Sequence, residues 1–126
     1  MSKRILIVDD EADINTTLHE ILESNGFIVD TFDNPHLALE NFKPRFYDLL
    51  ILDIKMSEMS GFSFYSEIKK LDDKMKVCFL TALEINLGAY SDILSSLPDK
   101  CIIRKPVTNE SLLKIINEVI MPSGNS

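Results

Sequence analysis

The chain alternates short, largely apolar runs with longer segments in which apolar residues recur every three or four positions. The runs predict five strands, in the segments 5–8, 27–32, 49–52, 77–80 and 101–103. The helical spacing, as in Ile14, Leu18, Ile21 and Leu22, predicts a helix after each strand. These helices are expected within the segments 14–24, 35–42, 62–71, 84–97 and 109–121.

The form of the apolar runs indicates how the strands are arranged. Apart from Asp30 and Thr31 in the second run, the runs are continuously apolar without alternating polar residues, which is typical of parallel strands covered on both faces. Right-handed crossovers then predict an α/β fold, a doubly wound five-stranded parallel sheet with helices on both faces. We expect the flavodoxin-like strand order 2-1-3-4-5, in which the first and third strands are neighbours.

The length of the chain bears on the number of domains, and its net charge bears on the classes of binding partner. The 126 residues are enough for one domain, which we expect to span 1–121, with 122–126 as a disordered tail or the start of a linker. The 13 Lys and Arg residues against 20 Asp and Glu residues leave a net charge of -7. This charge argues against binding of nucleic acid or of an anionic membrane surface through bulk electrostatics.

The cysteines and the absence of long apolar runs bear on the compartment. Cys78 and Cys101 both lie in apolar runs, so we interpret them as small buried residues of a reduced compartment, not as a disulfide framework. No apolar run approaches the roughly 18 residues that a membrane-spanning helix needs. The N-terminus lacks the long apolar stretch of a secretion signal. We therefore expect a cytoplasmic protein, either a monomer or a weak dimer.

Polar residues with potential chemistry stand where the predicted strands end. They are Asp9 and Asp10, Asp53, Thr81, and Lys105. In an open α/β sheet, ligands bind outside the carboxyl ends of the strands, at the point where the winding reverses. We expect the three aspartates to come together there, with Thr81 and Lys105 beside them.

Three neighbouring carboxylates repel one another, and a hard divalent cation relieves that repulsion. Mg²⁺, with Mn²⁺ as a substitute, prefers carboxylate and phosphate oxygens. When the three carboxylates, the divalent cation and Lys105 are counted together, the formal charge of the site is zero before a phosphoryl group binds. Asp53 is then the candidate nucleophile for forming an aspartyl-phosphate, and Thr81 can donate its hydroxyl to a phosphoryl oxygen.

These motifs, taken together, resemble those of a known family. The motifs are Asp9-Asp10-Glu11, the segment from Asp53 to Gly61, Thr81-Ala82, and Lys105-Pro106. In this order and on these elements, they are similar to the CheY-like receiver domains of two-component response regulators. The likeness spans residues 3 to about 120, and the complete set at the strand ends makes it specific.

The resemblance implies a role for each matching residue. Asp53 is the phosphoacceptor by this likeness, and Thr81, Ala82 and Lys105 hold the phosphoryl group. Asp10 and Asp53 bind Mg²⁺ directly, Asp9 binds it through water, and the backbone carbonyl of Lys55 completes the protein ligands.

The resemblance also implies partners and a mode of action. A histidine kinase, a histidine phosphotransfer protein or a small phosphodonor would supply the phosphoryl group, and the interaction surface would change for an unidentified output protein or domain. The domain would assist its own phosphorylation and dephosphorylation without being a conventional enzyme. Neither nucleic acid nor membrane is an expected partner.

Three departures from the family pattern bear on the conformational response to phosphorylation more than on phosphoryl transfer itself. Ser57 stands where the family commonly has proline, so we expect a less rigid loop. Ile102 stands where many receiver domains have the tyrosine or phenylalanine that follows phosphoryl binding. The segment 84–100 lacks the Gly-Ala-Asp run that usually precedes the fifth strand.

Other interpretations remain beside this one. The Lys55 side chain either tunes the lifetime of the phosphoryl group or is merely solvated. The alternative function is a protein-interaction module that keeps the fold and works without phosphorylation, which Ile102 favours. A dehalogenase-type phosphatase needs a second aspartate where this chain has Lys55, and a flavodoxin would need a phosphate-binding first loop, which Asp9-Asp10-Glu11 opposes.

Overall fold

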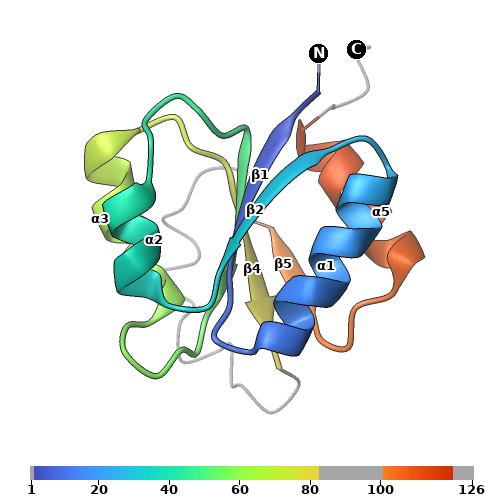
Figure 1. Cartoon of the computed structure of the whole chain (residues 1–126), viewed down its shortest axis with the longest axis horizontal. Helices are drawn as coiled ribbons and strands as arrows, with labels where there is room; N and C mark the ends of the chain where they lie inside the picture. The colour runs from blue at the N-terminus through green and yellow to red at the C-terminus, as the bar shows by residue number, and fades with distance from the viewer. Residues whose placement is uncertain (1, 83–100, 121–126) are drawn as a thin grey trace.

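The computed structural model describes residues 2–82 and 101–120. A single parallel sheet of five strands runs through the centre of the molecule, in the order β2-β1-β3-β4-β5 (Figure 1). The strands are β1 (Arg4–Val8), β2 (Ile28–Phe32), β3 (Leu49–Asp53), β4 (Val77–Thr81) and β5 (Ile102–Arg104). The predicted fold class and strand order are therefore confirmed.

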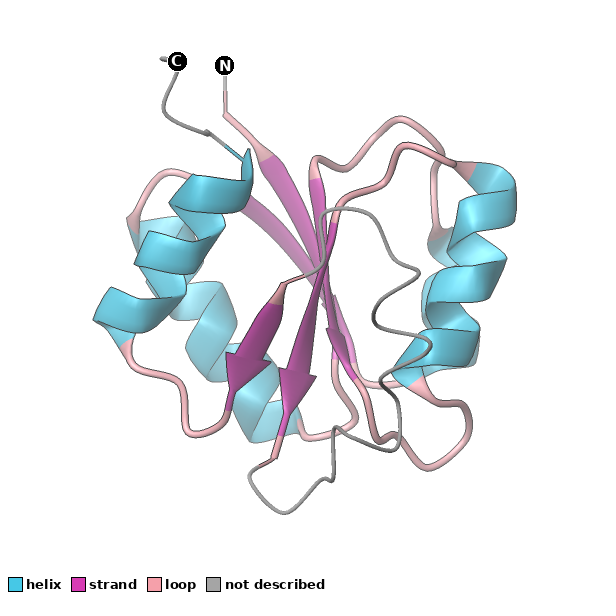
Figure 2. Ribbon diagram, turned by 180° about the vertical axis from the view of Figure 1, so that it is seen from behind, coloured by secondary structure: helices cyan, strands magenta, loops and turns pink. Residues whose placement is uncertain are grey.

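Helices cover both faces of this sheet. Among the described residues they are α1 (Ala12–Ser24), α2 (Pro35–Asn41), α3 (Gly61–Leu71) and α5 (Asn109–Ile120). Helices α2 and α3 lie on one face, and α1 and α5 lie on the other (Figures 1 and 2). None of the helices within 2–82 and 101–120 has the length and apolar character needed to cross a bilayer.

Local sequence signals fix the helix ends close to their predicted positions. Helix α1 ends at Ser24, and Gly26 two residues later has a φ of 92°, a left-handed conformation that suits glycine. Helix α2 begins with Pro35, and the Asn34 side chain accepts hydrogen bonds from the backbone N–H groups of His36 and Leu37.

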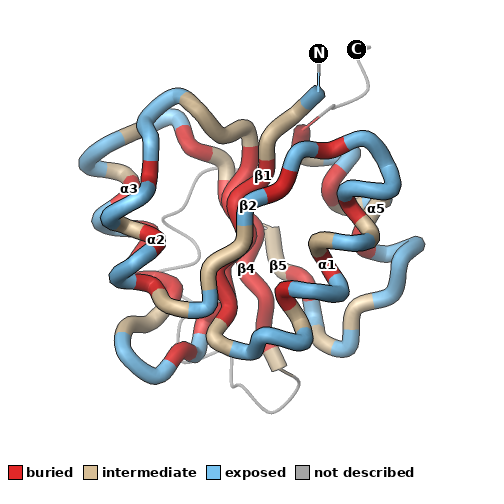
Figure 3. Tube along the Cα trace, in the orientation of Figure 1, coloured by how far each residue is buried: buried red, intermediate tan, exposed pale blue. Residues whose placement is uncertain are grey.

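The core is divided by the sheet into two apolar clusters. Successive strand residues point to opposite faces, so Leu50 and Leu52 pack against α2 and α3, whereas Leu49 and Ile51 pack against α1 and α5. Strands β1, β3 and β4 are buried almost throughout, which Figure 3 shows for β1 and β4. Burial on both faces explains why these three strands show no polar alternation, whereas the edge strand β2 carries the exposed Asp30.

Some boundaries differ from the predicted ones by a single residue. The fifth strand begins at Ile102 and includes Arg104, and the second begins at Ile28. Arg104 is exposed, but its backbone still pairs with β4. Because its side chain is polar, the apolar pattern of the sequence did not include it in the predicted strand. The helix expected within 84–97 and the tail expected at 122–126 lie outside the described residues.

Candidate functional site

The strand register brings the predicted site residues to one edge of the sheet. Val8 pairs with Leu52, so Asp9 and Asp53 follow at equivalent positions on adjacent strands. Thr81, at the end of β4, pairs with Arg104, the residue before Lys105. The parallel ladder therefore collects side chains that are far apart in the sequence.

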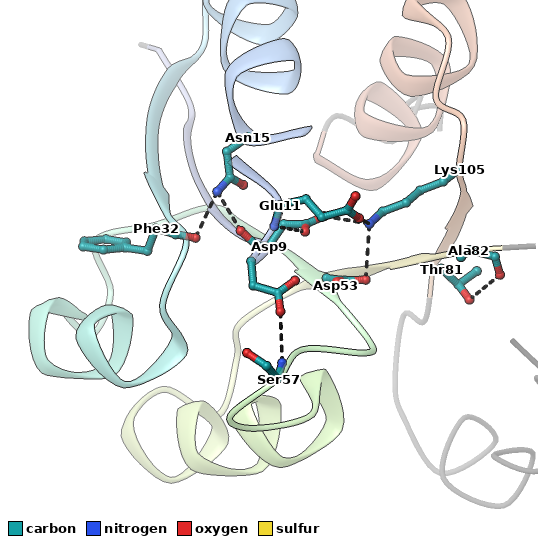
Figure 4. Close-up of polar contacts among 10 residues, drawn as sticks. Asp9, Glu11, Asn15, Phe32, Asp53, Ser57, Thr81, Ala82 and Lys105 are labelled. Carbon is teal, nitrogen blue, oxygen red and sulfur yellow. Dashed lines mark hydrogen bonds and ion pairs between the residues drawn. The ribbon is translucent and has the colours of Figure 1, made fainter. Parts of the chain in front are cut away.

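Lys105 is the cation of this cluster. Its Nζ lies 3.0 Å from Asp9 Oδ2, 2.8 Å from Glu11 Oε1 and 3.6 Å from Asp53 Oδ1 (Figure 4). The Lys105 side chain is only 12% exposed, and that of Asp9 is 0% exposed. One ammonium thus faces three carboxylates in a largely desolvated place, and the local charge of the protein groups alone remains negative.

Burial and crowding change the acidity of these groups. Burial, followed by the charge of Asp9, raises the pKa of Asp53 from its ordinary value to about 7, against the lowering effect of Lys105. Burial also raises the pKa of Asp9, although its bonds to the Glu11 N–H and to Lys105 oppose this. Burial would lower the pKa of Lys105, but hydrogen bonds to Glu11 and Asp9 outweigh that effect and raise it. The cluster is therefore short of positive charge.

Asp10 is held by the loop that follows β3. The backbone N–H of Ser57 donates a hydrogen bond of 3.0 Å to Asp10 Oδ2 (Figure 4). A proline at position 57 has no N–H and could not make this bond. The Ser57 departure, expected only to loosen the loop, thus adds a tether between the loop and an acidic side chain.

The three aspartates fit a hard divalent cation. Asp9, Asp10 and Asp53 each offer a carboxylate oxygen, and these atoms all lie within 4.8 Å of one another. Oxygen donors of this kind are the ligands that Mg²⁺ prefers, usually with water molecules completing the sphere. The raised pKa of Asp53 is a second sign that the site lacks a compensating positive charge.

The other residues singled out by the sequence analysis differ in their burial and in whether they contact the acidic cluster. Thr81 is fully buried, and its hydroxyl donates to the carbonyl oxygen of Ala82 at 3.2 Å. Ala82 is half-buried beside it, and Lys55 is exposed. Ile102 packs against the core cluster on the side of α2 and α3. The structure therefore brings Asp9, Asp53 and Lys105 into direct contact, whereas Thr81 lies alongside.

The backbone of Asp53 is closely packed against the start of α3. A Cβ atom added to Gly61 would lie 2.4 Å from the carbonyl oxygen of Asp53, which is closer than any side chain can approach. The Gly61 N–H donates to the carbonyl of Ile54 at 2.8 Å. Glycine is therefore required here by close approach, and the end of β3 that carries Asp53 packs directly against the start of α3.

Asn15 is a site residue that the sequence analysis missed. Its side-chain amide donates to the backbone carbonyls of Asp9, at 2.7 Å, and Phe32, at 3.2 Å (Figure 4). Asn15 is 6% exposed and thus joins the ends of β1 and β2 beneath the acidic cluster. The available signal was an amide near the start of the helix, on the same buried face as Leu18 and Leu22.

Replacing Asn15 by alanine is expected to destabilise the protein by about 1–3 kcal/mol, because two buried carbonyls lose a donor and a small cavity forms. Urea unfolding at pH 7 measures this change. Thr16→Ala is the matched control, since Thr16 is exposed and its hydroxyl bonds only within its own helix. An equal loss of stability in both variants would refute the positioning role of Asn15.

Comparisons with known proteins agree with this geometry. The family model described as the response regulator receiver domain matches residues 5–117. The chain is 33% identical to a chemotaxis protein CheY of Bacillus subtilis over 123 residues, covering 95% of this chain and 99% of that one. It is 32% identical to the solved CheY-like receiver domain of Methanospirillum hungatei, with a TM-score of 0.81 and coverage of 95% and 94%. A receiver domain structure from Clostridium thermocellum is 31% identical, with a TM-score of 0.79 and 94% coverage of both chains.

Proposed function

Because the chain belongs to the response regulator receiver family, we propose that it is a phosphorylation switch in which Asp53 accepts the phosphoryl group. The observation that carries this assignment is the contact of Lys105 with both Asp53 and Asp9 at the carboxyl edge of the sheet. This contact supports the proposal, because it gathers the candidate nucleophile, a cation and a further acid around one small volume.

In the proposed reaction, an Asp53 carboxylate oxygen attacks the phosphorus of a phosphohistidine or an acyl phosphate. The bond from phosphorus to the nitrogen or oxygen of the donor breaks, and the donor leaves with that electron pair. Lys105, which now contacts Asp9 and Glu11, would bind the new phosphoryl oxygens. The Thr81 hydroxyl would exchange its bond to the Ala82 carbonyl for one to the phosphoryl group.

We assign Mg²⁺ to Asp9, Asp10 and Asp53, since their donor atoms and excess negative charge fit a hard cation. When bound, the ion would neutralise charge that builds up during phosphoryl transfer. Asp10 is already oriented by Ser57, so this acid needs little reorganisation to serve as a ligand. The exposed Lys55 side chain lies on the loop between Asp53 and Ser57, where its backbone carbonyl would be the remaining protein ligand.

The proposed partners are a histidine kinase or a histidine phosphotransfer protein as donor, and an output protein or domain that binds the phosphorylated form. Family membership supports these classes of partner. The half-buried Ile102 supports a narrower proposal, that the usual aromatic element of the switch is replaced here by apolar packing of β5 against the core.

Intact mass after incubation with acetyl phosphate tests the chemistry. We expect the mass to increase by one phosphoryl group with Mg²⁺ present and to remain unchanged with a chelator. Hydroxylamine should remove the group, because an acyl phosphate is cleaved by this nucleophile. Asp73→Asn, which removes an exposed acid far along the chain, serves as a control and should react like the wild type.

The alternative function, an interaction module that works without phosphorylation, makes a different prediction. Neither acetyl phosphate nor beryllofluoride, a mimic of the phosphoryl group, would then change the mass or the melting temperature. A rise in melting temperature with beryllofluoride and Mg²⁺ together, beyond the rise that Mg²⁺ alone produces, would favour the phosphorylation switch.

A further inference from the structure

The two cysteines are neighbours across β4 and β5. Phe79 pairs with Ile102, so Cys78 stands opposite Cys101 one position earlier in the same ladder. The Phe79 N–H donates to the Cys101 carbonyl at 2.8 Å, which fixes this register at the cysteines themselves. Cys78 belongs to the core cluster on the side of α1 and α5, and the partly buried Cys101 packs against the same cluster.

This placement meets the geometric requirement for a disulfide. Neighbouring strands lie about 4.7–4.9 Å apart. Disulfides occur where the Cα atoms are about 4.4–6.8 Å apart and the Cβ atoms point to the same side. The strand register places Cys78 and Cys101 side by side, with both side chains on the α1 and α5 side of the sheet, so a disulfide between them is within reach.

The two thiols differ in exposure and acidity. Cys78 is fully buried, whereas Cys101 is half-buried at the start of β5. The hydrogen bond from the Cys78 thiol lowers the pKa of Cys101, against the raising effects of burial and of Glu118 on α5. The same bond raises the pKa of Cys78. Cys101 is therefore the more accessible and the more acidic of the two thiols, with a second thiol already beside it.

We propose that Cys78 and Cys101 form a redox couple that a peroxide converts into a reversible disulfide between β4 and β5. The Cys101 thiolate attacks one peroxide oxygen, the O–O bond breaks, and Cys101 becomes a sulfenic acid as water is released. The Cys78 sulfur then attacks the Cys101 sulfur, the S–O bond breaks, and a second water leaves with the Cys78 proton. Two thiols are oxidised and one peroxide is reduced to two waters, and a dithiol reverses the step by exchange.

This modification site is distinct from the proposed phosphorylation site. Cys78 is the second residue of β4 and Cys101 directly precedes β5, whereas the proposed phosphorylation site lies at the opposite ends of these strands, at Thr81 and just after Arg104. Its chemistry needs neither Mg²⁺ nor Asp53, so a failure of the proposed phosphorylation would leave it unaffected.

Trypsin provides a sharp test, because it cleaves after Lys76, Lys100 and Arg104. Cys78 then lies on peptide 77–100 and Cys101 on peptide 101–104. The folded protein is treated with a small excess of hydrogen peroxide, alkylated in denaturant, and analysed by mass spectrometry before and after digestion. We expect loss of two hydrogens, no alkylation, and a linked pair of peptides within one chain. Dithiothreitol should restore two alkylatable thiols.

Variants separate the two steps. In Cys78→Ala the Cys101 sulfenic acid should accumulate and react with dimedone, whereas in Cys101→Ser the buried Cys78 should stay reduced. Free thiols after peroxide treatment, a disulfide only between two chains, or oxidation of Cys101 to the sulfinic acid in the wild type would each overturn the proposal. The wild-type digest decides the question even if a variant fails to fold.

Discussion

Asp53→Asn is expected to abolish phosphoryl incorporation and, at the same time, to stabilise the metal-free protein above neutral pH. The amide removes the proposed nucleophile, so the mass gain with acetyl phosphate should disappear. It also removes a negative charge that is 4% exposed and lies beside Asp9. Phosphoryl incorporation is therefore expected to fall while the free energy of unfolding rises, as expected for a functional group whose buried charge destabilises the folded protein.

The sign of the pH dependence follows from the raised pKa of Asp53. In the unfolded chain this carboxyl ionises near its ordinary value of 3.8, whereas in the folded protein it holds its proton to about pH 7. The contribution of the Asp53 carboxyl to the free energy of unfolding is fully present below about pH 4 and is lost as the pH rises through about 7. Above that, the ionised Asp53 costs about 2–4 kcal/mol, which Asp53→Asn should recover.

Urea unfolding with a chelator at pH 5.5 and pH 8 measures this effect. The wild type should lose more stability than Asp53→Asn between the two values, and Mg²⁺ should restore the wild type far more than the variant. Asp73→Asn again serves as the control. A parallel loss of stability in the wild type and Asp53→Asn would contradict the raised pKa, and residual phosphorylation of the variant would place the acceptor elsewhere.

Lys105→Met is expected to destabilise the metal-free protein by about 2–4 kcal/mol at pH 8, because Asp9 and Asp53 lose their shared cation while buried. The loss should be smaller at pH 5.5, where Asp53 is protonated. Methionine keeps most of the apolar length of the lysine stem, so packing changes little.

The same variant should separate metal binding from the response to the phosphoryl group. With one fewer positive charge nearby, Mg²⁺ should still raise the melting temperature. Beryllofluoride should add at most a small further rise, since its partner Nζ is missing. Thermal unfolding with each ligand in turn measures both effects, and Lys74→Met at an exposed position is the control. A full beryllofluoride response in Lys105→Met would remove Lys105 from the proposed site.

The positions of the site residues were predictable because each follows a buried strand. A run such as Leu49–Leu52 identifies a strand, and the acid directly after it marks the edge where ligands bind. The strand ends depend only on periodicity and chain order, which the sequence contains. The strand order 2-1-3-4-5 was taken from the flavodoxin-like fold, because periodicity and chain order alone do not choose between the possible windings of parallel units.

The contacts between side chains were less predictable. The hydrogen bonds of Asn15 depend on how the first turn of α1 sits against the ends of β1 and β2. The bond from Ser57 to Asp10 depends on a loop that crosses back over the sheet edge. Both arise from tertiary placement and a single rotamer, and no local pattern of residues encodes them. Arg104 was likewise missed because its side chain is exposed while its backbone stays paired.

The register of the sheet also determines which mutations this protein can tolerate during evolution. Asp53 is the last paired residue of β3, and its side chain reaches the site only because successive residues alternate between faces. Deleting one residue within β3 would turn Asp53 toward the opposite helix layer, even if every other site residue stayed in place. Insertions in the connections between strands and helices leave that alternation intact. Lineages of this domain should therefore vary in loop length while keeping the number of residues in each strand constant.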